Sequence, residues 1–181
     1  EKGLIEEIGL SNTGPKRLSF LYQKLKERGI KINSIQMQFS LLTKPSLEDE
    51  KIKNICNENN IEYLAYSPLA LGLLTIPPNK SPKPSTFLRQ KLFERILPKT
   101  QELRELLASI GKKYSVSQAQ VALNWVRSHG SKPIVGIRNP LQAKDAISAL
   151  SWSLTKNEKE KLDSYRNKCL TNMPQNPFNS P

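Results

Sequence analysis

Cysteine and histidine are scarce in these 181 residues, and long apolar runs are missing. The two cysteines, Cys56 and Cys169, lie far apart without metal-ligand spacing, so we expect no metal site and reduced thiols in a cytoplasmic compartment. No apolar stretch approaches the roughly 18 residues that a membrane span needs. The opening EKGLIEEIGL has no signal-peptide or transit-peptide character. Because the chain begins with Glu1, we expect a fragment or a processed chain, and the plastid stroma is the alternative location if a transit peptide precedes it.

Acidic residues are outnumbered, with 16 Asp and Glu against 28 Lys and Arg and a net charge of +12. Such an excess raises the question of nucleic-acid binding. The basic residues are spread widely, however, and no RNA-binding or DNA-binding signature accompanies them. We therefore expect no nucleic-acid partner, and a basic groove for a small polyanionic molecule accounts for the same charge.

Glycine-rich phosphate motifs are absent too, which counts against the usual nucleotide-binding sheets. What the sequence does contain is a rhythm of strand, polar corner and helix. The apolar runs predict strands within residues 4–12, 32–42, 61–67 and 133–137. The 3.6-residue patterns predict helices over residues 13–29, 46–59, 97–114, 118–129, 140–150 and 155–167. We expect a proline-rich loop at 76–86 and an irregular tail packed through Phe178.

Local signals place several helix starts. Pro15 suits a first helical position, and three capping boxes pair a Ser or Thr with the residue three positions later. These boxes are Ser46 with Asp49, Ser117 with Gln120, and Thr155 with Glu158. His129, the single histidine, ends a predicted helix and is expected to be a surface or cap residue.

Four βα units in a row predict an α/β fold with parallel strands, either a doubly wound sheet or part of a (β/α)8 barrel. In both architectures ligands bind at the carboxyl ends of the strands. Each predicted strand here ends in polar or small residues, which we expect to share one ligand site. The four corners are Ser11–Asn12, Gln36–Gln38, Tyr66–Ser67 and Gly136–Arg138.

Four segments, IGLSN, SIQMQFSLL, AYSPLALGLLT and KPIVGIRNPLQAKDAISALSWSLT, resemble the last four strands of the aldo-keto reductase barrel in order and spacing. The segments LKERG, PSTFLRQ and QNPF look most like the cyanobacterial and plastid branch, which includes pyridoxal reductase-like proteins. The resemblance implies the C-terminal half, about strands 5–8, of a (β/α)8 TIM barrel, followed by a C-terminal helix. Residues 1–181 would then be one partial domain without the N-terminal half of the barrel.

The resemblance also implies a binding site for NADP(H). Ser11, Asn12 and Gln36 match the family's ligands of the nicotinamide carboxamide, and Tyr66 matches the aromatic residue that stacks on the nicotinamide. The segment that receives the pyrophosphate corresponds to Ser67, Pro68, Leu69 and Gly72. Gly136 and Arg138 match the turn that receives the 2′-phosphate of the adenosine, and Gln142 and Asp145 match its helix contacts. Ala146 stands where the family usually has Asn.

The implied activity is reduction of an aldehyde or ketone to an alcohol by hydride transfer from NADPH. The family's catalytic Asp, Tyr, Lys and His come from strands earlier in the barrel, so no catalytic residue is assigned here. We expect this cofactor-binding half to be inactive alone, with two unpaired strand edges, and its oligomeric state stays open. The alternative is a non-catalytic nucleotide-binding or regulatory module, which upstream catalytic residues would exclude.

Overall fold

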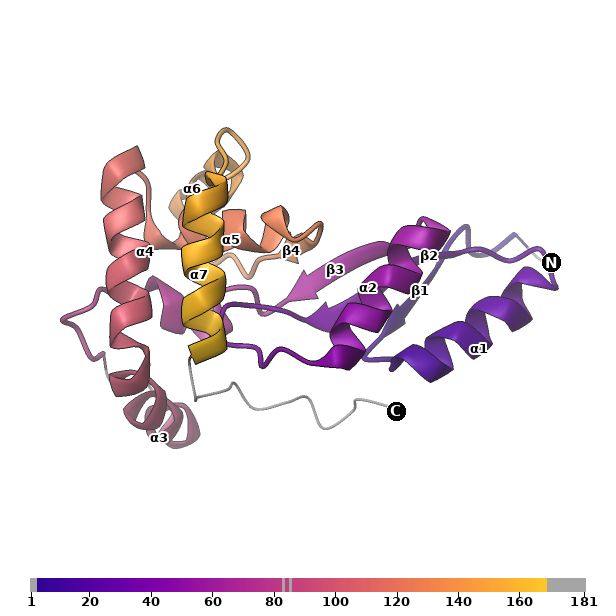
Figure 1. The fold of residues 1–181 in the computed structure, drawn as a ribbon, viewed down its shortest axis with the longest axis horizontal. Coiled ribbons are helices and arrows are strands. Elements are labelled where there is room, and N and C mark those ends of the chain that lie inside the picture. The colour runs from indigo at the N-terminus through magenta and orange to yellow at the C-terminus, as the bar shows by residue number, and fades with distance from the viewer. Residues whose placement is uncertain (1–2, 83, 85, 169–181) are drawn as a thin grey trace.

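A sheet of four parallel strands, seen in a computed structural model that describes residues 3–82, 84 and 86–168, confirms the predicted α/β fold (Figure 1). Phe178 and Cys169 lie outside the described residues. The strands pair in chain order and are β1 (Ile8–Ser11), β2 (Ile32–Gln38), β3 (Glu62–Tyr66) and β4 (Lys132–Ile134). The runs predicted for β1, β2 and β4 were too long. Beyond Gln38, for example, Phe39, Leu41 and Leu42 are apolar because they are buried in the core outside the sheet.

The predicted helices are present, and their caps form as the sequence indicates. The Ser46 hydroxyl accepts from the amide of Asp49 at 3.0 Å, and the Ser117 hydroxyl accepts from that of Gln120 at 3.1 Å. These helices are α1 (Pro15–Lys26), α2 (Leu47–Asn59), α4 (Gln101–Tyr114), α5 (Gln118–Ser128), α6 (Pro140–Ser148) and α7 (Lys156–Lys168).

Two elements are not in the sequence prediction. A 3-10 segment η1 (Ala70–Thr75) follows β3, and a helix α3 (Phe87–Ile96) follows the proline-rich loop. Of α3, only Phe93 and Ile96 are buried, whereas Phe87 and Leu88 in its first turn are exposed. A short 3-10 turn η2 (Pro98–Thr100) separates α3 from α4, which therefore begins at Gln101 rather than at Leu97.

The helices leave the two faces of the sheet in different environments. Ile35 and Met37 of β2 are buried together with Tyr63 and Ala65 of β3, which are their register partners. The alternate side chains, including Gln36 and Tyr66, are only partly covered. Successive side chains of a strand point to opposite faces. One face therefore forms the apolar core, and the other carries polar side chains that end at the strand termini.

Helices α4, α5 and α7 extend the core beyond the sheet (Figure 1). Trp125 of α5 is fully buried, stacks on Phe39 with 5.1 Å between ring centroids, and donates from Nε1 to Asp163 of α7 at 2.8 Å. His129 is the C-cap residue of α5, as predicted, but it is half-buried and pairs with the same carboxylate at 2.9 Å. Burial lowers the pKa of His129 to about 4.

The sheet has two open edges within the described part of the chain. β1 pairs only with β2, and β4 pairs only with β3. Next to β4, helix α6 buries none of its residues, and Leu141 and Ile147 are exposed. This open arrangement is what a partial barrel leaves. Among the described helices, none combines the length and apolar character that crossing a membrane requires.

We expect the stability of this fold to depend on Glu158 at acidic pH. Burial by itself raises the pKa of this carboxyl, but hydrogen bonds from Lys113, Thr155 and Tyr114 outweigh it and lower the pKa to about 2. A carboxyl with a pKa below its unfolded value of 4.5 stabilises the fold above that pH, and the contribution disappears as the pH falls towards 2. Its full size is about 3 kcal/mol.

Urea denaturation of the Glu158→Gln variant at a series of pH values measures this effect. The difference from the unaltered chain should be largest above pH 5 and shrink steadily towards pH 2. Glu160→Gln, at an exposed position of the same helix, is the matched control and should change little. A Glu158→Gln deficit that does not vary with pH would assign its role to packing instead.

Candidate functional site

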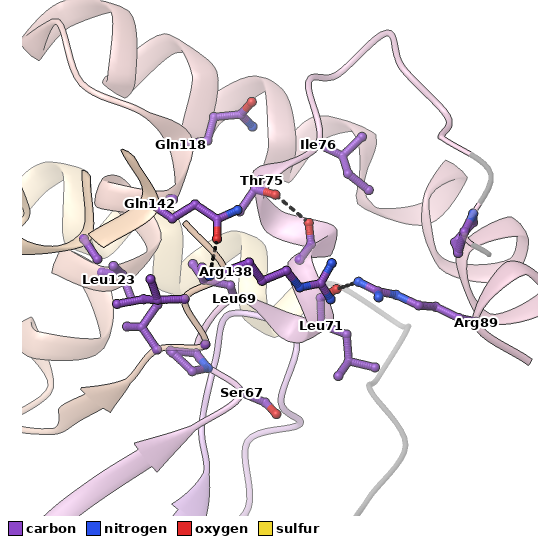
Figure 2. Close-up of a pocket in the computed structure, with 18 of the residues that line it drawn as sticks. Ser67, Leu69, Leu71, Thr75, Ile76, Arg89, Gln118, Leu123, Arg138 and Gln142 are labelled. Carbon is purple, nitrogen blue, oxygen red and sulfur yellow. Dashed lines mark hydrogen bonds between the residues drawn. The ribbon is translucent and has the colours of Figure 1, made fainter. Parts of the chain in front are cut away.

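An open cleft of about 1400 Å³ lies where β3 and β4 end (Figure 2). Its walls are η1 with the residues before it, helix α3, the first turns of α5, and the turn that joins β4 to α6. The residues predicted for pyrophosphate and adenosine that line it are Ser67, Pro68, Leu69, Gly72, Gly136, Arg138, Gln142 and Asp145. Segments that are about 70 residues apart in the sequence thus meet in one cavity.

The residues predicted for nicotinamide lie outside this cleft but are connected to one another. The Tyr66 hydroxyl donates to Oδ1 of Asn12 at 2.8 Å, across 54 residues of sequence. Nδ2 of Asn12 in turn donates to the hydroxyl of Ser11 at 3.2 Å, and the Asn12 amide donates to the carbonyl of Gln36 at 3.0 Å. Because Tyr66 directly precedes Ser67, this group adjoins the cleft at the end of β3.

Unusual backbone conformations concentrate at the same strand ends. Among the described residues, six that are not glycine have positive φ angles. Two of them, Asn60 and Ser115, are C-caps of helices, where this conformation is common. The other four lie directly after β1, directly after β3 or in η1, at or beside the predicted site: Asn12, Ser67, Ala70 and Leu71. Left-handed conformations cost free energy at such residues and are typical of ligand sites.

The turn between β4 and α6 is built by short-range hydrogen bonds. Asn139 caps α6 by accepting from the Gln142 amide at 2.9 Å, and Oε1 of Gln142 accepts from the Arg138 amide at 2.8 Å. The Arg138 side chain takes no part in these bonds and is exposed at the cleft. No atom comes within 4 Å of a Cβ added at Gly136, so open space adjoins the backbone there.

Asp145 has a structural role that the sequence did not indicate. One of its oxygens accepts from the Ser117 hydroxyl and the other from Nε2 of Gln120, both at 2.7 Å. These bonds fasten α6 to the start of α5 and thereby hold the β4–α6 turn in place. Each carboxylate oxygen retains acceptor capacity towards the cleft.

Arg89 of α3 is the cleft residue that sequence reasoning missed. Its Nη2 donates to the carbonyl of Leu71, and its guanidinium lies 5.2 Å from the centre of the Phe93 ring. In Figure 2, Arg89 and Arg138 extend towards Leu71 from opposite sides. Arg89 sits in a segment rich in basic residues, which offered no signal that this one faces a cavity.

The chemistry of the cleft suits binding of an anion. Among the described lining residues, Arg89 and Arg138 are the cations, and the single carboxylate, Asp145, is engaged by α5. None of those lining residues is a tyrosine, lysine or histidine, the usual donors for proton transfer to a carbonyl. Groups of three or more potential metal ligands do not occur in the described part of the chain.

Comparison with known sequences gives a consistent result. The family model described as aldo/keto reductase family matches residues 1–167. The chain is 40% identical over 178 residues to pyridoxal reductase, chloroplastic, of Arabidopsis thaliana, covering 98% of this chain and 48% of that protein. It is 30% identical over 134 residues to the putative aryl-alcohol dehydrogenase AAD16 of Saccharomyces cerevisiae, covering 72% and 38%. The chain thus spans about half the length of the curated relatives it matches.

Solved structures agree on the fold. The thermostable aldo-keto reductase Tm1743, solved in complex with the inhibitor epalrestat, superposes with a TM-score of 0.66 at 20% identity. The match covers 91% of this chain and 50% of that one. The parallel sheet is therefore part of a (β/α)8 barrel, as predicted. With the family model matching nearly the whole sequence, this chain belongs to the aldo/keto reductase family, whose members are oxidoreductases.

Proposed function

We propose that this chain forms the NADP(H)-binding half of an oxidoreductase that reduces an aldehyde or ketone to an alcohol. The observation that carries the proposal is the cleft at the ends of β3 and β4, where the predicted pyrophosphate and adenosine residues come together. Family membership and the 40% identity to a pyridoxal reductase support the reaction class.

The residues of the cleft fit a dinucleotide with phosphate groups. Gly72 has a φ of +88°, which a residue with a Cβ adopts only with strain, so the backbone stays accessible there. Gly136 leaves open space on the turn that also carries the exposed Arg138. A planar guanidinium pairs with two phosphate oxygens at once. Segments 67–72 and 136–138 would thus hold the pyrophosphate and the 2′-phosphate.

The nicotinamide would be held by the connected group next to the cleft, which consists of Ser11, Asn12, Gln36 and Tyr66. Ser, Asn and Gln offer both donors and acceptors, which a carboxamide requires, and an aromatic face suits stacking on the nicotinamide ring. The bond from Tyr66 to Asn12 orients both side chains before a ligand arrives. When bound, the cofactor supplies the hydride that a carbonyl carbon accepts.

No catalytic acid is proposed in this chain. Tyr114 does lie 3.2 Å from a lysine, Lys113, but both belong to the Glu158 network and neither lines the cleft. The proton for the alcohol would come from residues in the part of the barrel that this chain does not cover. The chain spans only about half of each relative. Reductase assays of the full-length gene product, with the carbonyl substrate varied, test the reaction itself. Inactivity of that product despite NADPH binding would favour the non-catalytic nucleotide-binding module.

Arg138→Ala tests the cofactor assignment. If Arg138 binds the 2′-phosphate, the variant should bind NADPH at least about tenfold more weakly, because it loses a charge-assisted hydrogen-bond pair. Its affinity for NADH, which has no 2′-phosphate, should remain nearly the same. Isothermal titration of the 181-residue chain with each cofactor measures both values.

Lys144→Ala is the matched control, because Lys144 is an exposed cation of α6 that does not line the cleft. It should leave both affinities unchanged. Equal losses for NADPH and NADH in Arg138→Ala would contradict a 2′-phosphate role. Failure of the unaltered chain to bind either cofactor would contradict the proposed function.

The remaining proposals concern partners and location. We propose a small carbonyl compound as the substrate. We also propose that the chain has no nucleic-acid partner, and the absence of salt-sensitive binding to polynucleotides would support this. For location we propose the cytoplasm, with the plastid stroma as the alternative, since the Arabidopsis relative is named chloroplastic. Subcellular fractionation with an antibody against this chain distinguishes the two.

A further inference from the structure

The outer side of helix α3 carries apolar residues that the packing of the helix does not use. Phe93 and Ile96 are its buried residues, and they hold it against the core. In its first turn, Phe87 is 67% exposed and Leu88 is 82% exposed. Single exposed apolar residues are common on protein surfaces, whereas large ones that stand next to one another form a patch that marks an interaction site.

Basic residues share this side of α3. At about 100° per residue, Lys91 and Arg95 project within the arc that Phe87 and Leu88 span. Both are exposed, and Nζ of Lys91 lies 4.6 Å from the centre of the Phe87 ring. Glu94 is the single carboxylate of the helix. We refer to Phe87, Leu88, Lys91 and Arg95 as the α3 surface.

The charge and shape of the α3 surface select the kind of partner. Residues 76–100 carry six Lys and Arg and one Glu, a net charge of +5. A second copy of this chain would bring the same cations face to face, which is unfavourable, whereas an anionic partner is complementary. Leu88 lies at the rim of the cleft, but the other three residues lie outside it. They form a convex ridge, which suits a broad, flat partner better than a peptide that needs a groove.

We propose that the α3 surface docks on a membrane that contains anionic lipids. Phe87 and Leu88 would enter the boundary between headgroups and acyl chains, and Lys91 and Arg95 would meet the lipid phosphates. The helix would lie on the membrane, because it lacks the length and apolar character that crossing requires. This inference does not depend on the proposed cofactor. Docking would turn the rim of the cleft, where Leu88 lies, towards the bilayer.

Co-sedimentation with lipid vesicles tests the proposal. The unaltered chain should bind vesicles of phosphatidylcholine with about one third phosphatidylglycerol, and should not bind pure phosphatidylcholine, which offers no net negative charge. Phe87→Ser should weaken binding to the anionic vesicles by about fivefold or more, because an apolar side chain no longer enters the bilayer. Lys91→Gln should weaken it by about fivefold. Absence of binding to the anionic vesicles would overturn the proposal.

A matched control lies at the opposite end of the molecule, on α1 (Figure 1). Residues 16–31 also carry six Lys and Arg and one Glu, so their net charge is the same +5. Phe20 is 61% exposed there, but it has no exposed apolar residue directly beside it. Phe20→Ser and Lys16→Gln should therefore leave vesicle binding unchanged. Losses as large as those of Phe87→Ser and Lys91→Gln would indicate general adsorption of a basic chain and overturn the assignment to α3.

Other anionic partners give different outcomes. A nucleic-acid partner would show itself as binding to polynucleotides that Phe87→Ser weakens, and an acidic protein as binding to poly-glutamate that the same change weakens. Either result without binding to anionic vesicles would overturn the membrane proposal. Circular dichroism of each variant verifies that it is folded.

A second measurement reports insertion directly. In a Phe87→Trp variant, the added indole should shift its fluorescence to shorter wavelength when anionic vesicles are added, because it moves from water into an apolar environment. The natural Trp125 is fully buried and should not respond. Phe20→Trp is the control and should show no shift. A Phe87→Trp spectrum that the vesicles leave unchanged would overturn the proposal.

Discussion

Trp125→Ala is expected to lower the free energy of unfolding by about 3–5 kcal/mol, the usual range for truncating a large buried aromatic residue. The indole is fully buried between the sheet and α7, where it stacks on Phe39 and donates to Asp163. Its removal leaves a cavity and takes from Asp163 one of its two hydrogen bonds, at the contact that joins α5 to α7. Urea denaturation, followed by circular dichroism, measures the loss.

Two further variants locate the source of that loss. Trp125→Phe keeps an aromatic ring against Phe39 but loses the bond to Asp163, so about 1–2 kcal/mol should disappear. Phe20→Ala removes an aromatic side chain that is 61% exposed, and should cost less than about 0.5 kcal/mol. A Trp125→Ala loss as small as that of Phe20→Ala would contradict the packing of α5 and α7 described above.

Arg104→Met is expected to lower the free energy of unfolding by about 3 kcal/mol and also to weaken cofactor binding. Arg104 is only 2% exposed, yet no carboxylate among the described residues pairs with it. Instead its guanidinium donates to the carbonyls of Pro77 at 2.8 Å and Leu97 at 3.2 Å. Hydrogen bonds from a charged group contribute about 1.5–3 kcal/mol each, and the variant removes both, although each carbonyl keeps a backbone donor from the turn that follows it.

The effect on binding follows from where those carbonyls lie. Pro77 follows η1, and Leu97 follows α3, so one side chain fixes both segments that border the cleft. Arg104→Lys keeps one donor group in place and should lose less stability. Thermal unfolding combined with NADPH titration separates the two effects. An Arg104→Met variant that is destabilised but binds NADPH normally at a temperature where it is folded would contradict the link to the cleft.

The elements of this fold could be predicted where the sequence carries a local signal. The serine caps of α2 and α5 act through one side chain and one amide three residues away, so their pattern is visible in sequence. The polar residues that follow each strand could also be recognised from the sequence. Parallel strands end at one edge of a sheet, and corners far apart in sequence therefore meet there.

Features that depend on contacts between distant segments could not be predicted in this way. Arg89 and Arg104 belong to a stretch with many other basic residues, and only packing distinguishes them from solvated ones. Asp145 was predicted to contact the adenosine. Its bonds to Ser117 and Gln120 could not be predicted, because they form only when α6 packs on α5. Helix α3 was missed although Phe93 and Ile96 are buried, because its first turn, with Phe87 and Leu88, is exposed and directly follows the proline-rich loop.

The cleft draws all of its described lining residues from positions 67–146, which form two consecutive βα units with their connecting segment. The proposed binding site for the phosphates of the dinucleotide is thus contiguous in the gene. Recombination or duplication could transfer it as one block, and the reacting end of the active site could diversify in a separate block. In evolutionary terms, these two βα units would form a module that could retain the proposed cofactor while the substrates of the reaction change.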